Sequence, residues 1–418
     1  MDIAKEVTSI AKRAKSASRA LSGISCEAKN KALLAMAQSL IKNSQILIRA
    51  NKKDLLAAGG MRLNAAMIDR LRLTEKSIQQ MSASLKAIAA LKDPLGRVIR
   101  SVKRPNGLVI KKVSTPIGVV AIIYESRPNV TSDCIGLCLK SGNAVILRGG
   151  REAIHSNIAI YNLLKAQLRR YNISQDAVGI IKSVDRKAVD ILLGLNELVD
   201  LVIPRGGEGL IKAVAEKSKI PVIKHYKGIC HTYVDNKADL NLARKVAFNA
   251  KVQRPGVCNA METLLVHKDI AKKFLPKMVK DLKDAGVEIR ADAATRHIVK
   301  GLKKAKPEDW GREYLDLILS VKVVGGLEEA IRHIDDYGSG HSDAIITKDK
   351  KRAERFLERV DSACLFVNAS TRFTDGYEFG LGAEMGISTD KLHARGPMAL
   401  EELTTYKYKI FGKGQIRT

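Results

Sequence analysis

Residues 117–150 read IGVVAIIYESRPNVTSDCIGLCLKSGNAVILRGG. This stretch has two runs of buried-strand length, Ile117–Tyr124 and Ala144–Leu147, on either side of a helical run at Val130–Lys140. A strand, a helix and a second strand in this order are typical of a parallel sheet, because the helix carries the chain back across one face. The stretch therefore predicts an α/β fold.

The same alternation continues beyond residue 150. Helical runs follow at Ala153–Arg169 and Leu210–Lys217, and strand-like runs at Leu201–Ile203 and Val222–Lys224. The alternation resumes over Thr263–Val367, which predicts a second parallel-sheet unit. Because 418 residues exceed what one core usually supports, we expect two α/β domains.

Amphipathic helices are predicted before the first strand, over Asp2–Leu91. Lys, Arg and Ser near the N-terminus are found in targeting peptides, but Asp2, Glu6 and the helical spacing of the apolar residues favour an ordinary first helix. The turn Asp93-Pro94 ends the pattern. Two apolar stripes are expected to fill a core: Leu33, Met36, Leu40 and Leu47 on one helical face, and Ile78, Met81, Leu85 and Ile88 on another.

A β-hairpin is predicted at about residues 97–115. Two β-rich runs, Val98–Val102 and Leu108–Val113, flank Pro105-Asn106-Gly107, and Asn-Gly between such runs is a strong hairpin signal. We expect this hairpin to project from the domain. A further strand is predicted at Thr404–Ile410, near the C-terminus.

The composition limits the classes of protein. Lys and Arg number 72 against 44 Asp and Glu, a net charge of +28, which raises nucleic-acid binding as one interpretation. The basic residues are dispersed and aromatic residues are only 4%, so a solvated basic surface that attracts anionic small molecules is favoured. No apolar run has the roughly 20 residues of a membrane span, and no cluster has metal-ligand spacing. Six scattered cysteines favour a reducing cytoplasm.

One cysteine lies in a loop that suits a nucleophile. Residues 249–263 read NAKVQRPGVCNAMET, which places Cys258 between a helical stretch and the apolar strand that includes Leu264–Val266. Most buried cysteines have apolar neighbours and act as small hydrophobes, whereas Cys258 is flanked by Gly256 and Asn259. The location predicts covalent chemistry at sulfur.

Two glycine-containing turns follow strands of the first unit and precede helices. They are Arg148-Gly149-Gly150-Arg151 and Pro204–Gly209, which contains Gly206 and Gly207. Their amides could cradle a phosphate, although neither is a G-x-G-x-x-G and an ordinary tight turn explains each equally well. A cation at the strand end, Arg148, favours the 2′-phosphate of NADP over NAD, the alternative being a surface arginine.

Asn129 follows a strand and begins a helix, in Tyr124-Glu125-Ser126-Arg127-Pro128-Asn129-Val130. It could cap the helix or donate to a developing oxyanion.

Four stretches together resemble one family: Tyr124–Val130, Gln253–Thr263, Val324–Thr347, and Val367–Gly376 continuing through Leu392–Pro397. The third includes AIRHI at 330–334 and YGSGHSD at 337–343, and the fourth begins VNASTRFTDG. With these motifs the chain resembles the glutamate-5-semialdehyde dehydrogenases, or γ-glutamyl phosphate reductases, a proline-biosynthesis branch of the aldehyde dehydrogenase superfamily. The resemblance spans nearly the whole chain.

The resemblance implies roles for individual residues. Cys258 matches the nucleophile, Asn129 the oxyanion-stabilising asparagine and, less securely, Glu313 the glutamate that holds the nicotinamide ribose. It also implies an aldehyde dehydrogenase-like α/β fold with a cofactor domain at residues 1–232, a catalytic domain at 233–364, and a return to the cofactor domain at 365–418. The hairpin and the C-terminal strand would form an oligomerisation element, which predicts a homo-oligomer.

One departure from the wider superfamily bears on the reaction. Hydrolytic members carry a glutamate followed by Leu-Gly-Gly that activates water, whereas the corresponding stretch here is His225-Tyr226-Lys227-Gly228. An enzyme that passes its acyl group to hydride or phosphate has no use for an activated water. Ser370 and Arg372 are candidate substrate contacts, although Arg372 could instead stabilise a loop, and His341 and His393 could be structural hydrogen-bonders.

The resemblance implies NADPH-dependent reduction of L-glutamyl 5-phosphate to L-glutamate 5-semialdehyde and phosphate, through a thioester on Cys258. Two alternatives are a hydrolytic aldehyde dehydrogenase, which the missing glutamate disfavours, and a basic nucleic-acid-binding protein. The resemblance leaves open a transient contact with glutamate 5-kinase, the enzyme that makes the acyl phosphate.

Overall fold

The computed structural model describes residues 2–61, 63 and 65–417. They form two compact units: the described residues up to 224, together with 380–386 and 398–417, belong to the first, and residues 225–379 and 387–397 to the second. These boundaries differ from the predicted ones at 232 and 364. A cut at 232 would divide β7 (Cys230–Val234), and one at 364 would remove most of β13 (Cys364–Val367), and both strands belong to the second unit's sheet.

The first unit contains a four-stranded parallel sheet in the order β5-β4-β3-β6. Its strands are β3 (Val119–Tyr124), β4 (Ala144–Gly149), β5 (Val178–Ile180) and β6 (Leu201–Arg205). Successive strands run outward from β3 on one side, and β6 then joins β3 on the other side. This reversal of strand order is the point at which open α/β sheets bind ligands. The strand expected at Val222–Lys224 is absent, because only Val222 forms an isolated bridge, with Val202.

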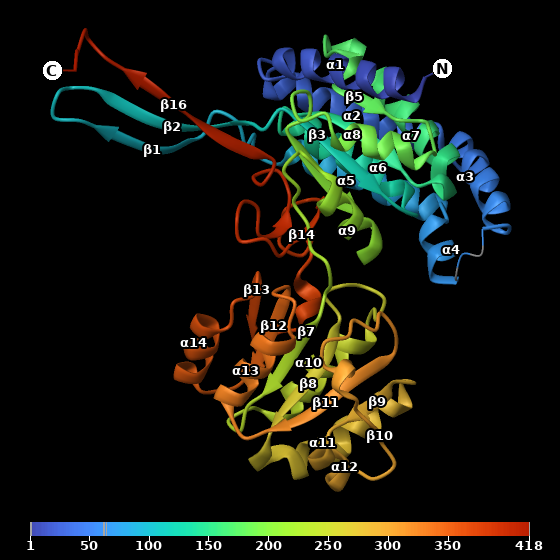
Figure 1. Cartoon of the computed structure of the whole chain (residues 1–418), viewed down its shortest axis with the longest axis vertical. Coiled ribbons are helices and arrows are strands. Elements are labelled where there is room, and N and C mark those ends of the chain that lie inside the picture. The colour runs from blue at the N-terminus through green and yellow to red at the C-terminus, as the bar shows by residue number, and fades with distance from the viewer. Residues whose placement is uncertain (1, 62, 64, 418) are drawn as a thin grey trace. The chain divides into compact units, whose positions relative to one another are not determined.

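Helices cover both faces of this sheet (Figure 1). On one face α1 (Ile3–Leu21), α8 (Arg186–Leu193) and α9 (Glu208–Lys217) share an apolar core with β3, β4 and β6. On the other face α6 (Pro128–Lys140) contacts both β3 and β4. The helix α7 (Ile154–Leu168) packs against α6.

The N-terminal helices confirm the predicted pattern, with one correction. They are α1, α2 (Cys26–Lys42), α3 (Ser44–Ala58), α4 (Ala65–Leu71) and α5 (Glu75–Ala90). Leu33, Met36 and Leu40 are fully buried on α2, but Leu47 lies on α3, because Asn43 interrupts the helix. The second stripe, on α5, is buried as expected.

A three-stranded antiparallel sheet in the order β1-β2-β16 projects from the helices of the first unit (Figure 1). The predicted hairpin forms β1 (Val98–Lys103) and β2 (Val109–Pro116), and the predicted C-terminal strand, β16 (Thr404–Phe411), pairs with β2 along its whole length. At the turn, Gly107 has φ 90°, a left-handed conformation that glycine adopts without strain.

The second unit contains a seven-stranded sheet in the order β10-β9-β11-β8-β7-β12-β13, in which all paired strands are parallel. Besides β7 and β13, the strands are β8 (Met261–His267), β9 (Glu288–Ala291), β10 (Lys303–Lys304), β11 (Ile318–Val324) and β12 (Ser342–Ile346). One apolar core lies under α10 (Leu240–Val252) and α11 (Lys268–Asp284), and another under α13 (Leu327–Tyr337) and α14 (Lys350–Arg359).

Shorter elements complete the chain. They are α12 (Ala293–Ile298), the strands β14 (Gly386–Ser388) and β15 (Gly396–Met398), which pair with each other, and the 3-10 turns at Arg151–Ala153, Arg169–Tyr171, Gln175–Ala177, Pro307–Asp309 and Thr371–Phe373. The chain passes from one unit to the other within both β14 and β15. In the part of the chain that is described, no helix combines the length and the apolar character needed to cross a membrane.

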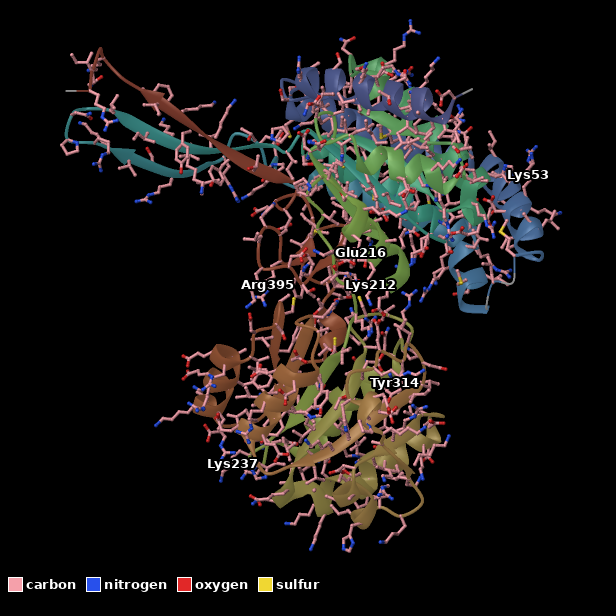
Figure 2. The ribbon with its side chains drawn as sticks, in the orientation of Figure 1. Lys53, Lys212, Glu216, Lys237, Tyr314 and Arg395 are labelled. Carbon is pink, nitrogen blue, oxygen red and sulfur yellow. The ribbon has the colours of Figure 1, made fainter. Side chains whose placement is uncertain are left out.

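Basic side chains are distributed over many elements of both units (Figure 2). Among the labelled residues, Lys53 lies on α3, Lys212 on α9, Lys237 between β7 and α10, and Arg395 just before β15. This distribution agrees with the dispersed charge expected from the sequence.

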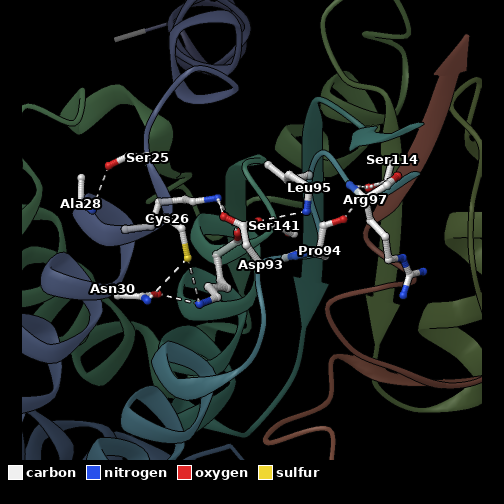
Figure 3. Close-up of polar contacts among 12 residues, drawn as sticks. Ser25, Cys26, Ala28, Asn30, Asp93, Pro94, Leu95, Arg97, Ser114 and Ser141 are labelled. Atoms are coloured by element: carbon white, nitrogen blue, oxygen red, sulfur yellow. Dashed lines mark hydrogen bonds and ion pairs between the residues drawn. The ribbon is translucent and has the colours of Figure 1, made fainter. Parts of the chain in front are cut away.

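A buried polar network joins the helices of the first unit to the base of the projecting sheet (Figure 3). Lys29 on α2 is fully buried, and its ammonium lies 2.8 Å from Asp93 and donates to the Lys140 carbonyl at 3.1 Å. The Lys140 ammonium donates to Asn30 and to the Ala89 carbonyl at 2.6 and 3.0 Å. Burial and the nearby Lys29 lower the pKa of Lys140.

The next residues extend this network to the hairpin. The Ser114 hydroxyl on β2 donates to the Pro94 carbonyl at 2.6 Å and accepts from the Arg97 amide at 3.0 Å. The backbone of the turn after α5 is therefore held both by a partly buried ion pair and by the start of the sheet.

We predict that Asp93→Asn destabilises the first unit by about 3 kcal/mol, because it leaves the Lys29 ammonium buried without a counter-charge. Glu27→Gln is the matched control, because Glu27 pairs with Lys31 in an exposed position and its loss should change little. Amide hydrogen exchange of α2 and α5 in increasing urea measures both. Equal stabilities of the two variants would contradict the prediction.

Candidate active site

Cys258 lies in the loop between α10 and β8, as the sequence predicts. The loop turns at Pro255 and Gly256, and the Ala260 amide donates to the Val257 carbonyl at 3.1 Å, which closes a second turn around Cys258. Cys258 is only partly buried, whereas Asn259 and Ala260 are buried. The Cys258 side chain is therefore partly accessible, on a loop whose backbone is held in place.

Gly228 packs directly against the backbone of Cys258. A β-carbon at position 228 would lie 2.0 Å from the Cys258 carbonyl oxygen and 2.5 Å from its Cα. The stretch His225–Gly228 corresponds, by the resemblance in sequence, to the one that carries the water-activating glutamate in hydrolytic family members. Through Gly228 it borders Cys258. Only glycine fits at this contact, because the obstructing atoms are backbone and cannot turn aside.

Two further groups hold this contact in place. The Gly228 amide donates to Glu313 at 3.0 Å, and the buried Cys230 thiol donates to the Cys258 carbonyl at 3.2 Å. Burial raises the pKa of Cys230 well above its usual value, so this sulfur remains a protonated donor. The predicted ribose contact of Glu313 stays a prediction, and its observed role is to fix the loop beside Cys258.

A buried ion pair supports the same region from behind. Lys251, near the end of α10, lies 2.6 Å from Glu262 on β8, and both side chains are almost completely buried. Burial raises the pKa of Glu262 and lowers that of Lys251, while the close contact opposes both shifts. The second Glu262 oxygen accepts from the Leu315 amide at 3.2 Å, which fixes the segment that carries Glu313.

The stretch predicted to contact substrate encloses Asn259. Its Nδ2 donates to the Thr374 carbonyl at 2.8 Å, its Oδ1 accepts from the Arg372 guanidinium, and its carbonyl accepts from the Thr371 hydroxyl at 2.7 Å. Arg372 also donates to Gln253 at 2.9 Å. Arg372 therefore stabilises the loop, which the sequence left open, and its predicted substrate contact stays a prediction.

Other predicted residues of this region have mainly local partners. Ser370 is buried and its hydroxyl caps the 3-10 turn that contains Arg372. His341 is buried with Nδ1 2.9 Å from the Ser342 hydroxyl, which fits structural hydrogen bonding, and His393 is exposed. Burial lowers the pKa of Arg372, and the positive charge of Arg254 lowers it further, so the two guanidinium groups repel one another.

Asn129 belongs to the first unit and stands at the second position of α6. It does not cap the helix, because Arg127 occupies the capping position and Pro128 begins the helix. Instead its exposed amide group donates to Asp133 at 3.2 Å. The side chain thus projects from the helix start, at the end of β3.

The first unit has a cavity of about 810 Å³ at the carboxyl ends of its strands, a size suited to a small molecule or cofactor. Arg148 lines it together with Gly150, Arg151 and Arg186. Burial and Arg186 lower the pKa of Arg148, whose buried Nε has no partner in the described part of the chain. These cations suit a phosphate group.

The predicted phosphate-binding glycines are arranged differently. Gly149, Gly206 and Gly207 do not line the cavity, although Gly150 and Gly209, which belong to the same two turns, do. The Gly207 amide, at the start of α9, donates to the Glu125 carboxylate at 2.9 Å. A carboxylate of the chain itself therefore occupies the helix N-terminus that was expected to hold phosphate.

Known proteins similar to this chain show its family. The model of the aldehyde dehydrogenase family matches residues 2–298 and 312–408. Gamma-glutamyl phosphate reductase from Caldanaerobacter subterraneus subsp. tengcongensis is 55% identical over 99% of this chain and 100% of that protein, and the enzyme of that name from Nautilia profundicola is 56% identical over 98% and 99%.

A solved structure agrees with these relatives. The crystal structure of gamma-glutamyl phosphate reductase from Thermotoga maritima has a TM-score of 0.96 and 45% identity, over 99% of this chain and all of that one. The chain therefore belongs to the aldehyde dehydrogenase family and, within it, to the gamma-glutamyl phosphate reductases.

Sequence reasoning missed three residues that support the site: Gly228 as a packing contact, Glu262 as an anchor, and Asp133 as the partner of Asn129. Glu262 follows Cys258 by four positions and lies near the start of an apolar strand, so a charged residue there was a detectable signal. Asp133 follows Asn129 by one helical turn, a spacing at which side chains meet.

We predict that Gly228→Ala destabilises the second unit by about 1–3 kcal/mol, because the new methyl group would overlap the backbone of Cys258. Gly311→Ala is the matched control, since a β-carbon there meets nothing within 4 Å. The single tryptophan, Trp310, belongs to the second unit, so urea unfolding followed by its fluorescence reports on that unit. An unchanged midpoint for Gly228→Ala would show that the loop can move aside freely.

Proposed function

We propose that this chain reduces L-glutamyl 5-phosphate to L-glutamate 5-semialdehyde and phosphate, with NADPH as reductant, as a step of proline biosynthesis. The observation that carries the proposal is the accessible Cys258 in a fixed loop bordered by a stretch without a carboxylate. The full-length likeness to proteins named gamma-glutamyl phosphate reductase supports the choice of substrate.

Cys258 is the nucleophile in this proposal. Its thiolate attacks the acyl carbonyl of the substrate, a carbon–sulfur bond forms, and phosphate departs with the bonding electrons. Sulfur suits this step because a thiolate is strongly nucleophilic near neutral pH. Asn129 and the Cys258 backbone amide are the proposed donors to the oxyanion.

The thioester must then reach its reductant without meeting an activated water. His225, Tyr226 and Lys227 supply no carboxylate next to the cysteine, and Glu313 already accepts the Gly228 amide. This arrangement favours reduction, or transfer to phosphate in the reverse direction, over hydrolysis. Collapse of the resulting thiohemiacetal would release the aldehyde and regenerate the Cys258 thiolate.

The substrate carries a phosphate and an α-carboxylate, which require cations. Arg254 and Arg372 are the proposed sources of positive charge. Ser370 is a weaker proposed contact, through its neutral hydroxyl, because it is buried. The positive net charge of the chain would attract such an anionic substrate.

The cavity at the carboxyl ends of β3 and β4 fits NADPH, because the buried Arg148 Nε has no partner among the described residues and Arg186 lines the same cavity. When bound, the cofactor supplies the hydride that reduces the thioester. Arg148 would bind the 2′-phosphate, and Gly150 would allow close approach of the chain. Gly149, Gly206 and Gly207 remain proposed neighbours of the cofactor.

The reaction predicts phosphate-dependent chemistry in reverse. Purified protein given glutamate semialdehyde and NADP should reduce NADP only when inorganic phosphate is present, and Cys258→Ala should lose nearly all of this activity because no thioester can form. Absorbance of the reduced nicotinamide measures it. Reduction without phosphate would favour the hydrolytic alternative, and substantial activity in Cys258→Ala would exclude the covalent route.

The projecting sheet is the proposed surface for self-association. Its strands expose large apolar and aromatic side chains. On β16 these are Tyr406, Tyr408, Ile410 and Phe411, which are 49–60% exposed, and on β1 they are Val98 and Ile99, which are 48–49% exposed. Apolar side chains gathered on one exposed sheet commonly mark an interface. A homo-oligomer built through this sheet is therefore proposed, and a transient contact with glutamate 5-kinase remains a separate proposal.

We predict that the double variant Tyr408→Ser and Ile410→Ser has a lower oligomeric state than wild type. Both substitutions remove apolar surface that the proposed interface would bury. Leu56→Ser is the control, since Leu56 is 73% exposed on α3, away from this sheet in sequence and structure. Sedimentation equilibrium gives the mass of each variant. An unchanged mass for the double variant would remove β16 from the interface.

A further inference from the structure

The side chain of Asn129 is held by a carboxylate one helical turn along α6. Asn129 Nδ2 donates to Asp133 Oδ2 at 3.2 Å, and Asp133 Oδ1 accepts from the Ser84 hydroxyl on α5 at 2.8 Å. Both carboxylate oxygens of Asp133 therefore have a partner. Ser84 fixes the carboxylate, and the carboxylate in turn fixes the amide.

This contact decides which way the amide faces. An ionised carboxylate only accepts hydrogen bonds, so it selects the NH₂ side of Asn129 and rejects its carbonyl. The NH₂ group has two hydrogens, and one remains available to a second acceptor. A protonated Asp133 could instead donate, which would allow the Asn129 carbonyl to take its place.

Charged groups around Asp133 control its ionisation. Burial raises its pKa to about 6, while the Ser84 and Asn129 hydrogen bonds and Arg205 oppose the shift and Glu384 adds to it. Arg205 ends β6, and Glu384 belongs to the short segment 380–386 of the same unit. The pKa lies close enough to neutrality for protonation to occur in a mildly acidic solution.

We propose that Asp133 is a positioning residue for the reaction, holding the Asn129 amide with its N–H side available to the oxyanion. The inference rests on the proposed function, in which Asn129 stabilises the tetrahedral intermediate. Asp133 itself touches no reacting atom in this scheme. It acts only through Asn129, and this restriction separates it from a residue that merely supports the fold.

The pH dependence follows from the ionised form being the active one. Above about pH 6 the carboxylate is charged and orients the amide, and below that pH the orientation is lost as the proton binds. The ratio of wild-type kcat to that of Asp133→Asn should therefore be large at pH 8 and fall towards one below pH 6. Taking the ratio cancels any other pH dependence that both proteins share.

The decisive experiment is a double-mutant cycle with Asn129→Ala, Asp133→Asn and the double variant, assayed by phosphate-dependent NADP reduction. Asn129→Ala should lower kcat by about 100- to 1,000-fold, as expected for one oxyanion donor. Asp133→Asn should lower kcat at least tenfold with little change in KM. In the Asn129→Ala background the same change should alter kcat less than twofold.

Two further variants keep the test specific. Ser84→Ala removes a hydrogen bond to the ionised form and should move the acid limb of the profile to higher pH. Asp176→Asn, an exposed carboxylate paired with Arg13, is the control and should leave kcat unchanged. Circular dichroism confirms folding of each variant.

The outcomes distinguish the two levels of inference. Equal losses from Asp133→Asn with and without Asn129, or a wild-type to variant ratio that does not change with pH, would overturn the positioning role. An inactive wild-type protein, or an Asn129→Ala variant as active as wild type, would instead overturn the proposed function on which the inference rests.

Discussion

The buried ion pair between Lys251 and Glu262 connects the segments that form the Cys258 site. Lys251 comes from the helix before the cysteine, Glu262 from the strand after it, and Glu262 also holds the Leu315 amide. Leu315 has φ 54°, a left-handed conformation that a leucine adopts only when its surroundings enforce it. The pair thus fixes the segment carrying Glu313, which binds Gly228, which packs on Cys258.

A buried pair of this kind contributes more to geometry than to stability. Removing two charges from water costs several kcal/mol per ion, and the attraction between them often does no more than offset that cost. Apolar residues of similar volume would serve the core equally well, but they would not hold the Leu315 amide. Lys29 and Asp93 form a comparable pair in the first unit, where the network they belong to fixes the base of the projecting sheet.

The spacing of apolar residues predicted the architecture, because it shows which face of each helix or strand is buried. Most elements of both units follow this rule. It failed where a single residue decided: Asn43 ends α2 before Leu47, and Val222 forms only one bridge. Sequence motifs identified Cys258 and Asn129 as candidates, since Cys258 precedes the strand β8 and Asn129 follows the strand β3. They could not reveal Gly228 beside Cys258, because that contact joins positions 30 residues apart. Nor could they reveal the Glu125 carboxylate at the start of α9, because Glu125 follows β3 and is 82 residues from Gly207.

Asn259 and Asn129 show why local sequence alone does not assign a role. Asn259 adjoins Cys258, the proposed nucleophile, yet it is buried and its side chain already bonds Thr374 and Arg372 on both its donor and its acceptor sides. Its hydrogen-bonding capacity is used by the fold. Asn129 is exposed, and among the described residues its side chain bonds only Asp133, so donor capacity remains for a reacting oxygen. Oxyanion stabilisation requires a free N–H group that is already held in position, since the donor must be in place before the charge develops.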